Sequence, residues 1–126
     1  MSNSIQAADL RAAVNEILGD YAEDVTEATD KAVEDTAKQA VRKLKSAKPG
    51  FTDRKYSKGW TKKVTKHRLY SEAKVYNRTE GHLTHLLEFG HVKSNGGRTT
   101  AYPHIAPVND RIPDMFQNSF TEALNN

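Results

Sequence analysis

The sequence contains no cysteine, which excludes disulfide bonds, thiolate nucleophiles and thiolate metal ligands. It also lacks any apolar run that approaches the roughly 20 residues of a membrane-spanning helix. Polar residues follow Met1–Ser4, where a secretory signal would have a basic stretch and an apolar core. We therefore expect a protein of a reducing compartment, with no secretory signal and no membrane segment.

Apolar and aromatic residues are scarce as well. Hydrophobic residues make up 37% of the 126 residues and aromatic residues 8%, and the mean hydropathy is −0.77. A chain of this length buries one modest core, so we expect a single domain over 1–126. Its low hydropathy indicates an extensive solvated surface or an elongated shape, while readable helices and strands exclude disorder throughout.

Charges of opposite sign are concentrated in different parts of the chain, although the formal net charge is only +3. Residues 1–41 carry three basic and nine acidic side chains, a net charge of −6. Residues 42–78 carry thirteen basic and two acidic side chains, a net charge of +11, and residues 79–126 have a net charge of −2. This division suits head-to-tail contacts between copies, or contact with a charged partner.

Residues 5–46 are predicted to form one long helix. Its apolar positions recur every three or four residues, as on one helix face: Leu10, Val14, Ile17, Tyr21, Val25, Ala28 and Ala32. After Ala32 the apolar face turns, which predicts a bend or a change of packing partner near residue 33. The helix either lies over a small sheet along its length, or packs its first half on a neighbouring subunit. The second interpretation makes Leu10, Val14, Ile17 and Tyr21 contact residues.

A hairpin is predicted over 58–77, after a loop that opens at Lys48–Gly50. Strands are expected at 58–65 and 67–77, because small or apolar residues alternate with polar and aromatic ones in the second segment. The members expected to face the helices are Leu69, Ser71, Ala73 and Val75. A short third strand over 99–103 would extend the hairpin to a sheet of about three strands.

Two further helices complete the predicted α+β fold. A short helix over 80–89, capped by Thr79, buries Leu83, Leu86 and Leu87 and ends at Gly90. A mobile loop over 91–101 with little to order it follows. A C-terminal helix over 105–124 packs on the sheet, and Pro113 either kinks it or starts a second segment. Its apolar stripe consists of Ile105, Val108, Ile112, Phe116, Phe120 and Leu124.

No catalytic, cofactor or metal site is expected, and no small-molecule substrate. His82, His85, His91 and His104 lie close in sequence, but their spacing matches no established zinc pattern. Glu88 as a general base would need a pocket and a partner that the sequence does not supply, so we expect it to bond with the 91–101 loop. The 93–98 segment lacks the glycine–lysine spacing of a phosphate loop. These absences argue against an enzyme.

The basic region at 42–78 has some nucleic-acid character, with Tyr56 and Trp60 among its cations. Neutralisation of phosphates by such a patch would give salt-dependent binding without sequence preference. Lysine dominates over the arginine that reads bases. The alternative is a basic hairpin that meets acidic surfaces of another protein, and both interpretations remain open.

One pair of segments resembles a known family. Leu86-Leu87-Glu88-Phe89-Gly90 precedes Ala101-Tyr102-Pro103-His104-Ile105-Ala106-Pro107-Val108. The pattern resembles that of the gene-product-ten-like phage tail-component proteins, in which Leu-Leu-Glu-Phe-Gly precedes Ala-Arg-Pro-Phe-Leu-x-Pro-Ala. Tyr102 replaces the usual arginine and His104 the usual phenylalanine. The matching motif residues are Leu86, Leu87, Glu88, Phe89, Gly90, Pro103 and Pro107.

The resemblance implies a non-enzymatic virion protein of the neck of long-tailed phages, assembled in the host cytoplasm. Such proteins act in head–tail joining or tail completion, as oligomeric rings around the DNA channel. The implied partners are further copies of the chain, other neck and tail proteins, and the DNA that passes through. We expect subunit or partner contacts at Lys62, Lys63, Lys93 and Arg98 in addition to the helix residues. The side chains expected to hold the fold together are Leu86, Leu87, Phe89, Ile105, Phe116 and Phe120.

Overall fold

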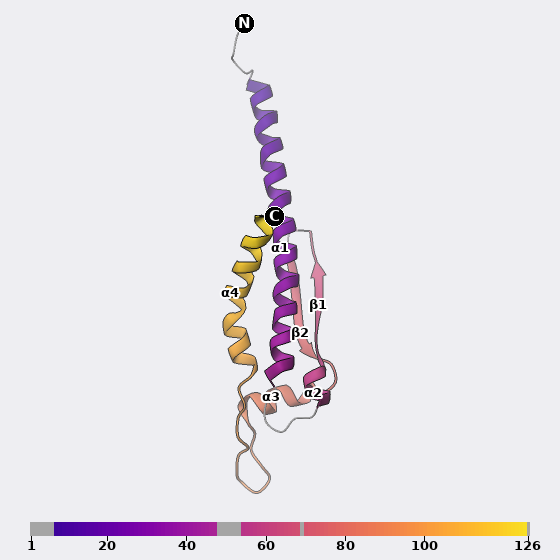
Figure 1. The fold of residues 1–126 in the computed structure, drawn as a ribbon, viewed down its shortest axis with the longest axis vertical. Helices are drawn as coiled ribbons and strands as arrows, with labels where there is room; N and C mark the ends of the chain where they lie inside the picture. The colour runs from indigo at the N-terminus through magenta and orange to yellow at the C-terminus, as the bar shows by residue number, and fades with distance from the viewer. Residues whose placement is uncertain (1–6, 48–53, 69, 126) are drawn as a thin grey trace.

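The protein is elongated around one long helix (Figure 1). The structure, a computed structural model, describes residues 7–47, 54–68 and 70–125. The elements are α1 (Ala7–Ala47), α2 (Arg54–Lys58), β1 (Trp60–Lys66), β2 (Ser71–Asn77), α3 (His82–Phe89) and α4 (Ile105–Leu124). The predicted order of a long helix, a hairpin, a short helix and a final helix is confirmed. Residues 5 and 6, where the long helix was expected to begin, lie outside the described residues.

Helix α1 is unbroken through Val33, so what changes along it is the packing partner. Every described side chain before Val25 is exposed, and this N-terminal half projects beyond the rest of the molecule (Figure 1). From Ala28 onward, α1 packs between α4 and the hairpin. The buried positions there are mostly small, which lets the neighbouring elements approach closely: Ala28, Ala32, Thr36, Ala37, Ala40 and Leu44.

Enlarging one of these alanines is expected to destabilise the fold. Ala32 is fully buried, so in Ala32→Leu three further carbons must displace packed neighbours, lowering the free energy of unfolding by about 1–3 kcal/mol. Urea denaturation followed by circular dichroism measures this. Ala13→Leu, on the exposed part of the same helix, is the matched control and should change stability by less than about 0.5 kcal/mol. Equal losses in both variants would contradict this packing.

Among the described residues the sheet consists of β1 and β2, paired antiparallel from Trp60↔Asn77 to Lys66↔Ser71. The predicted hairpin is confirmed, but its first strand begins at Trp60 because Arg54–Lys58 form α2, which the sequence analysis did not predict. The third strand predicted over 99–103 is wrong. The backbone N–H of Tyr102 donates to Leu87 O, and that of Thr99 donates to His91 O, so this segment binds α3 and its own loop instead of a sheet edge.

The predicted inward face of the second strand is only partly described. Leu69 lies outside the described residues, while Ser71 and Val75 are half-buried and Ala73 is exposed. The Ser71 hydroxyl donates a hydrogen bond to the Asp30 carboxylate, and Val75 packs against the core. Two of the three described positions therefore contact the body of the protein, whereas Ala73 stands open to solvent.

Helix α4 lies along α1 and not on the sheet, which corrects the predicted packing (Figure 1). It continues through Pro113 as one helix, so no second segment starts there. Its buried residues are Val108, Met115 and Ser119, and Ser119 Oγ accepts a hydrogen bond from Gln39 Nε2 at 3.3 Å. Phe116 and Phe120, expected to hold the fold, are only half-buried and stack on each other with ring centroids 6.1 Å apart.

The hydrophobic core lies where α1, α2, β1 and α4 meet. Its central buried members are Ala40, Leu44, Tyr56, Trp60 and Val108. Half-buried residues from β2, α3 and α4 pack against them: Val75, Leu83, Leu87, Ile105 and Ile112, with Val41 of α1. All of these lie at or beyond residue 40, so this cluster is at the end of the body away from the projecting part of α1, while Ala28, Ala32, Ala37 and Met115 extend the buried contacts along α1 and α4.

Candidate functional site

Five exposed large hydrophobic residues of the described chain lie on the projecting half of α1. Ile17 and Tyr21 are 66% and 67% exposed. The residues of this surface, here called the α1 stripe, are Leu10, Val14, Ile17, Leu18 and Tyr21, half of the ten large hydrophobic residues that are exposed. Monomeric proteins rarely expose a contiguous apolar surface of this kind without a partner.

The α1 stripe continues the face that α4 covers in the body of the protein. A shallow hollow lined by Tyr21, Val25 and Ala28 of α1 and by Ala123 and Leu124 of α4 marks where α4 ends. Beyond this point the same helix face is uncovered. At about 100° per residue, most carboxylates of this half lie on the opposite side of the helix: Glu16, Asp20, Glu23 and Glu27. This half of α1 therefore has one apolar side and one acidic side.

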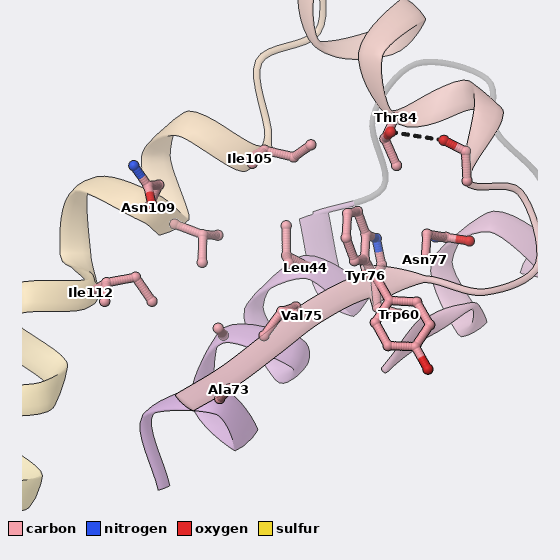
Figure 2. A pocket seen from close by; sticks show the side chains of 13 residues that line it. Leu44, Trp60, Ala73, Val75, Tyr76, Asn77, Thr84, Ile105, Asn109 and Ile112 are labelled. Carbon is pink, nitrogen blue, oxygen red and sulfur yellow. Dashed lines mark hydrogen bonds between the residues drawn. The ribbon is translucent and has the colours of Figure 1, made fainter. Parts of the chain in front are cut away.

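A second apolar surface is the groove between β2 and α4 (Figure 2). Ala40 and Leu44 of α1 form its floor, and its volume is about 510 Å³. Ala73 and Val75 form one wall, and α4 forms the other with Ile105, Val108 and Ile112. The groove exists because α4 packs on α1 and leaves the sheet uncovered. Its lining is mainly apolar, with Asn77, Thr84 and Asn109 among its polar members.

Glu88 joins the two motif segments through the start of α4. Its Oε1 accepts hydrogen bonds from the backbone N–H groups of His104 at 2.8 Å and Ile105 at 2.7 Å, and its Oε2 accepts one from Ala106 at 2.9 Å. His104, the N-cap residue of α4, makes no capping bond with its own side chain. A carboxylate from α3 thus binds the free N–H groups and complements the positive end of the helix dipole. The sequence analysis placed the partner of Glu88 in the 91–101 loop. That prediction was wrong, because the donors are residues 104–106.

The environment of Glu88 keeps it ionised. It is 5% exposed, and this burial acts to raise its pKa. The three backbone donors and the nearby His104, whose Nδ1 lies 3.1 Å from Oε1, outweigh burial and lower the pKa below its ordinary value. Glu88 thus holds the start of α4 against α3 through three backbone N–H groups and His104. We call this set of contacts the Glu88 clamp.

His104 extends this clamp to the core. Its Nδ1 lies 2.8 Å from Tyr102 O and its Nε2 lies 2.6 Å from the Tyr56 hydroxyl. Nδ1 faces the Tyr102 carbonyl and the Glu88 carboxylate, which only accept, so Nδ1 donates to them. Burial, with the nearby Glu88 carboxylate, raises the pKa of Tyr56 to about 12. The ring of Trp60 packs edge-on against both rings.

Asn77 organises the turn between β2 and α3. Its Oδ1 accepts from the backbone N–H groups of Thr79 and Glu80 at 3.3 and 2.9 Å, and its Nδ2 donates to Tyr56 O at 2.7 Å. The Thr79 hydroxyl donates instead to Lys55 O at 2.6 Å. The prediction that Thr79 caps the short helix was therefore wrong. Asn77 is buried at the end of β2 and holds the turn that leads into α3, whose N-cap residue Gly81 has no side-chain capping bond.

The loop after α3 is more ordered than predicted. Val92 and Arg98 form a β-bridge, Lys93 N donates to Gly97 O at 2.6 Å, and the Arg98 guanidinium donates to Phe89 O at 3.1 Å. Phe89 is 61% exposed and its ring lies against that of His85, so its predicted role in holding the fold was wrong. The loop projects from the end of the molecule opposite the tip of α1 (Figure 1).

Gly90 ends α3 in a conformation that only glycine adopts readily, with φ 71° and ψ 174°. A Cβ at this position would lie 2.6 Å from Thr99 O. Gly90→Ala is therefore expected to lower the free energy of unfolding by about 2 kcal/mol, as measured by urea denaturation. Gly97→Ala is the control, because its Cβ would lie 3.4 Å from the nearest atom. A neutral Gly90→Ala would contradict this account of the turn.

The structure does not gather the predicted contact residues into one place. Leu10, Val14, Ile17 and Tyr21 lie on projecting α1, Lys62 and Lys63 lie on β1, and Lys93 and Arg98 lie on the far loop. Of the motif residues, Leu86 and Leu87 are half-buried, while Pro103 and Pro107 are exposed at the start of α4.

The sequence analysis did not predict the hydrogen bonds of Tyr56 and Asn77, nor the contribution of His104 to the clamp. A signal for the clamp was available, because the start of α4 has no Ser, Thr, Asp or Asn at its cap.

Within the described residues, no three potential metal ligands converge, and none of the described helices has the length and apolar composition needed to cross a membrane. No curated protein and no solved structure gives a significant match to the chain. One family profile, described as "Bacteriophage HK97-gp10, putative tail-component", matches residues 8–90. This match includes α1, the hairpin and Leu86–Gly90, and stops before the Ala101–Val108 segment. The chain therefore belongs to the HK97-gp10-like family of bacteriophage tail components.

Proposed function

We propose that this chain is a structural protein of the phage neck, which joins head to tail or completes the tail as part of an oligomeric ring around the DNA channel. The observation that carries the proposal is the α1 stripe, an apolar surface on a helix half that nothing else in the described chain covers. Such a stripe is left exposed when its partner is another subunit. The family match, which begins at residue 8, includes this half of α1.

The charge distribution supports contacts between unlike faces of neighbouring copies. The projecting half of α1, residues 10–27, carries five carboxylates and one cation. The hairpin carries Lys62, Lys63, Lys66, Arg68 and Lys74, none of which is in a carboxylate ion pair among the described residues. Contacts between two different faces of each copy are heterologous, and heterologous contacts form a ring when the rotation from one copy to the next closes. The exposed end formed by Phe89, Val92 and Lys93 is then free for another neck or tail protein.

The test uses phage particles that lack this protein. Purified heads and purified tails are mixed with and without the chain, and infectious particles are counted. We expect a rise of at least about 100-fold when the chain is added, because joining needs the missing neck component. Equal counts with and without the chain would contradict a role in head–tail joining or tail completion.

The alternative is a small nucleic-acid-binding protein that uses the 42–78 region without sequence preference. It is favoured by the same unpaired hairpin cations, which would neutralise phosphates and release counterions. Its test is the affinity of the purified chain for duplex DNA between 50 and 200 mM salt, where each phosphate contact contributes about −0.9 to the logarithmic slope. A steep slope that Lys62→Glu and Lys63→Glu reduce would favour the alternative, whereas weak binding would exclude it.

A further inference from the structure

Resting on the ring proposed above, we propose that the α1 stripe of one copy lies in the groove between β2 and α4 of the next copy. Both surfaces are apolar, and both are open in the single chain. The proposal thus assigns one partner, a second copy of this chain, to two surfaces that the fold leaves uncovered.

The shapes of the two surfaces correspond to a helix that enters a groove. The α4 wall of the groove extends from Ile105 to Ile112, two turns of helix. The central part of the α1 stripe, from Val14 to Tyr21, also extends over two turns. At about 1.5 Å per residue each is roughly 10 Å long. Ile17 and Leu18, near the middle of this part, would face Ala40 and Leu44 of α1, and Figure 2 shows Leu44 between the two walls.

The charges beside the two surfaces also correspond. When the α1 stripe faces into the groove, the carboxylates on the other side of the helix remain at the protein surface. The wall formed by β2 belongs to the basic hairpin, in which Lys74 is exposed two positions before Tyr76 and lies over its ring at 5.8 Å. An acidic helix is thus placed beside a basic hairpin, which favours association and orients the two copies.

Pairing the α1 stripe with the same stripe of another copy is the main competing arrangement. It would bring two helix halves of the same negative sign within the 8–10 Å of packed helices, and their charges would repel. It would also leave the groove uncovered. An isologous contact of this kind gives a closed dimer and not a ring.

The distance between the two contact surfaces along α1 determines how α1 lies in the ring. Ile17 and Leu44 are separated by roughly 40 Å along the same helix, at about 1.5 Å per residue. Each contact therefore displaces the next copy along the direction of α1. For such contacts to close into a ring, α1 must run around the circumference and not parallel to the channel.

Engineered disulfides test the contact directly, because the chain contains no cysteine of its own. Ile17→Cys is made in one batch of protein and Ala73→Cys in another. Both positions are exposed in the single chain, so neither change disturbs the core. The batches are mixed, allowed to assemble and oxidised. We expect a cross-linked dimer, since the paired Cα atoms must lie within about 7 Å.

The control replaces Ile17→Cys by Glu16→Cys, on the acidic side of the same helix, and should give at least about tenfold less cross-linked dimer. Dimers formed by Ile17→Cys alone, in excess over the mixed product, would overturn the proposal in favour of stripe-to-stripe pairing. Assembly without a mixed cross-link would overturn this contact and leave the ring standing. A chain that stays monomeric, and that also fails to restore head–tail joining, would overturn both.

A mixture of blocked variants gives an independent readout. Ile17→Asp blocks the α1 stripe and Ala73→Glu blocks the groove, so each variant alone should be monomeric. Together they retain one intact stripe and one intact groove, and an equimolar mixture should form a 1:1 dimer and nothing larger. A mixture that remains monomeric, while the unaltered chain assembles, would contradict the assigned pair of surfaces.

Discussion

Replacing Glu88 by alanine is expected to lower the free energy of unfolding by about 3 kcal/mol, one of the two largest effects in the molecule. The change removes three charge-assisted hydrogen bonds at 2.7–2.9 Å and leaves the N–H groups at the start of α4 without their acceptor. Since domains of this size are stable by about 5–15 kcal/mol, the loss is a large part of the total. Urea denaturation at pH 7, followed by circular dichroism, measures it.

Two further variants separate the clamp from a general effect of lost charge. Glu88→Gln keeps one acceptor oxygen but loses the negative charge, so its loss should be about half that of Glu88→Ala. Glu122→Ala removes an exposed carboxylate near the other end of α4 and should change stability by less than about 0.5 kcal/mol. Equal effects of Glu88→Ala and Glu122→Ala would show that the clamp does not stabilise the start of α4.

The same carboxylate gives the fold a pH dependence of known sign. The pKa of Glu88 is lower in the folded chain than its ordinary value of 4.5. Its contribution to stability is therefore fully present above pH 4.5 and is lost as the pH falls through the lower folded pKa. Unfolding free energies measured from pH 7 downward should show this loss in the unaltered chain, and Glu88→Gln should lack this component.

Ile17→Asp is expected to abolish self-assembly without lowering the stability of the single chain. Ile17 is 66% exposed, so the folded monomer gains or loses little when it becomes polar. In an apolar interface, however, an unpaired carboxylate costs several kcal/mol, which raises the dissociation constant by at least about 100-fold. Sedimentation velocity over a concentration series measures the change in assembly, and urea denaturation measures the monomer.

The matched control is Asn15→Asp, which adds the same charge to an exposed position of the same helix away from the α1 stripe. It should leave the dissociation constant within about threefold. If Asn15→Asp and Ile17→Asp weaken assembly equally, net charge and not the apolar stripe would govern association.

Periodic patterns in the sequence predicted α1, α3, α4 and the hairpin, but not α2, because local spacing of apolar residues determines which face can be buried. The predicted packing of α4 on the sheet failed for a different reason. The stripe from Ile105 to Leu124 shows that α4 has a buried side, but both α1 and β2 offer apolar partners. The small residues Ala28 and Ala32 share a helix face with Gln39, which bonds to Ser119 of α4, so they allow α4 to approach α1 closely, and that preference depends on three-dimensional packing.

Three-dimensional packing also limited what the sequence could predict about the candidate site. The sequence identified Glu88 as a bonding residue, but not its partner, because residues 91–101 and 104–106 are both within reach of the end of α3. It also predicted contacts for the α1 residues, and their exposure in the folded chain is the observation on which the proposed assembly rests. The groove that would receive them was not predicted, since it is formed by α1, β2 and α4 together.

The most direct test of the assembly account is the mass of the purified chain, measured by light scattering after size exclusion at two salt concentrations, with and without duplex DNA. The account predicts an oligomer larger than a dimer whose mass does not depend on DNA, and which Ile17→Asp converts to the 14.1 kDa monomer. A monomer that binds DNA tightly at low salt and releases it at high salt, and that Ile17→Asp leaves unchanged, would contradict it.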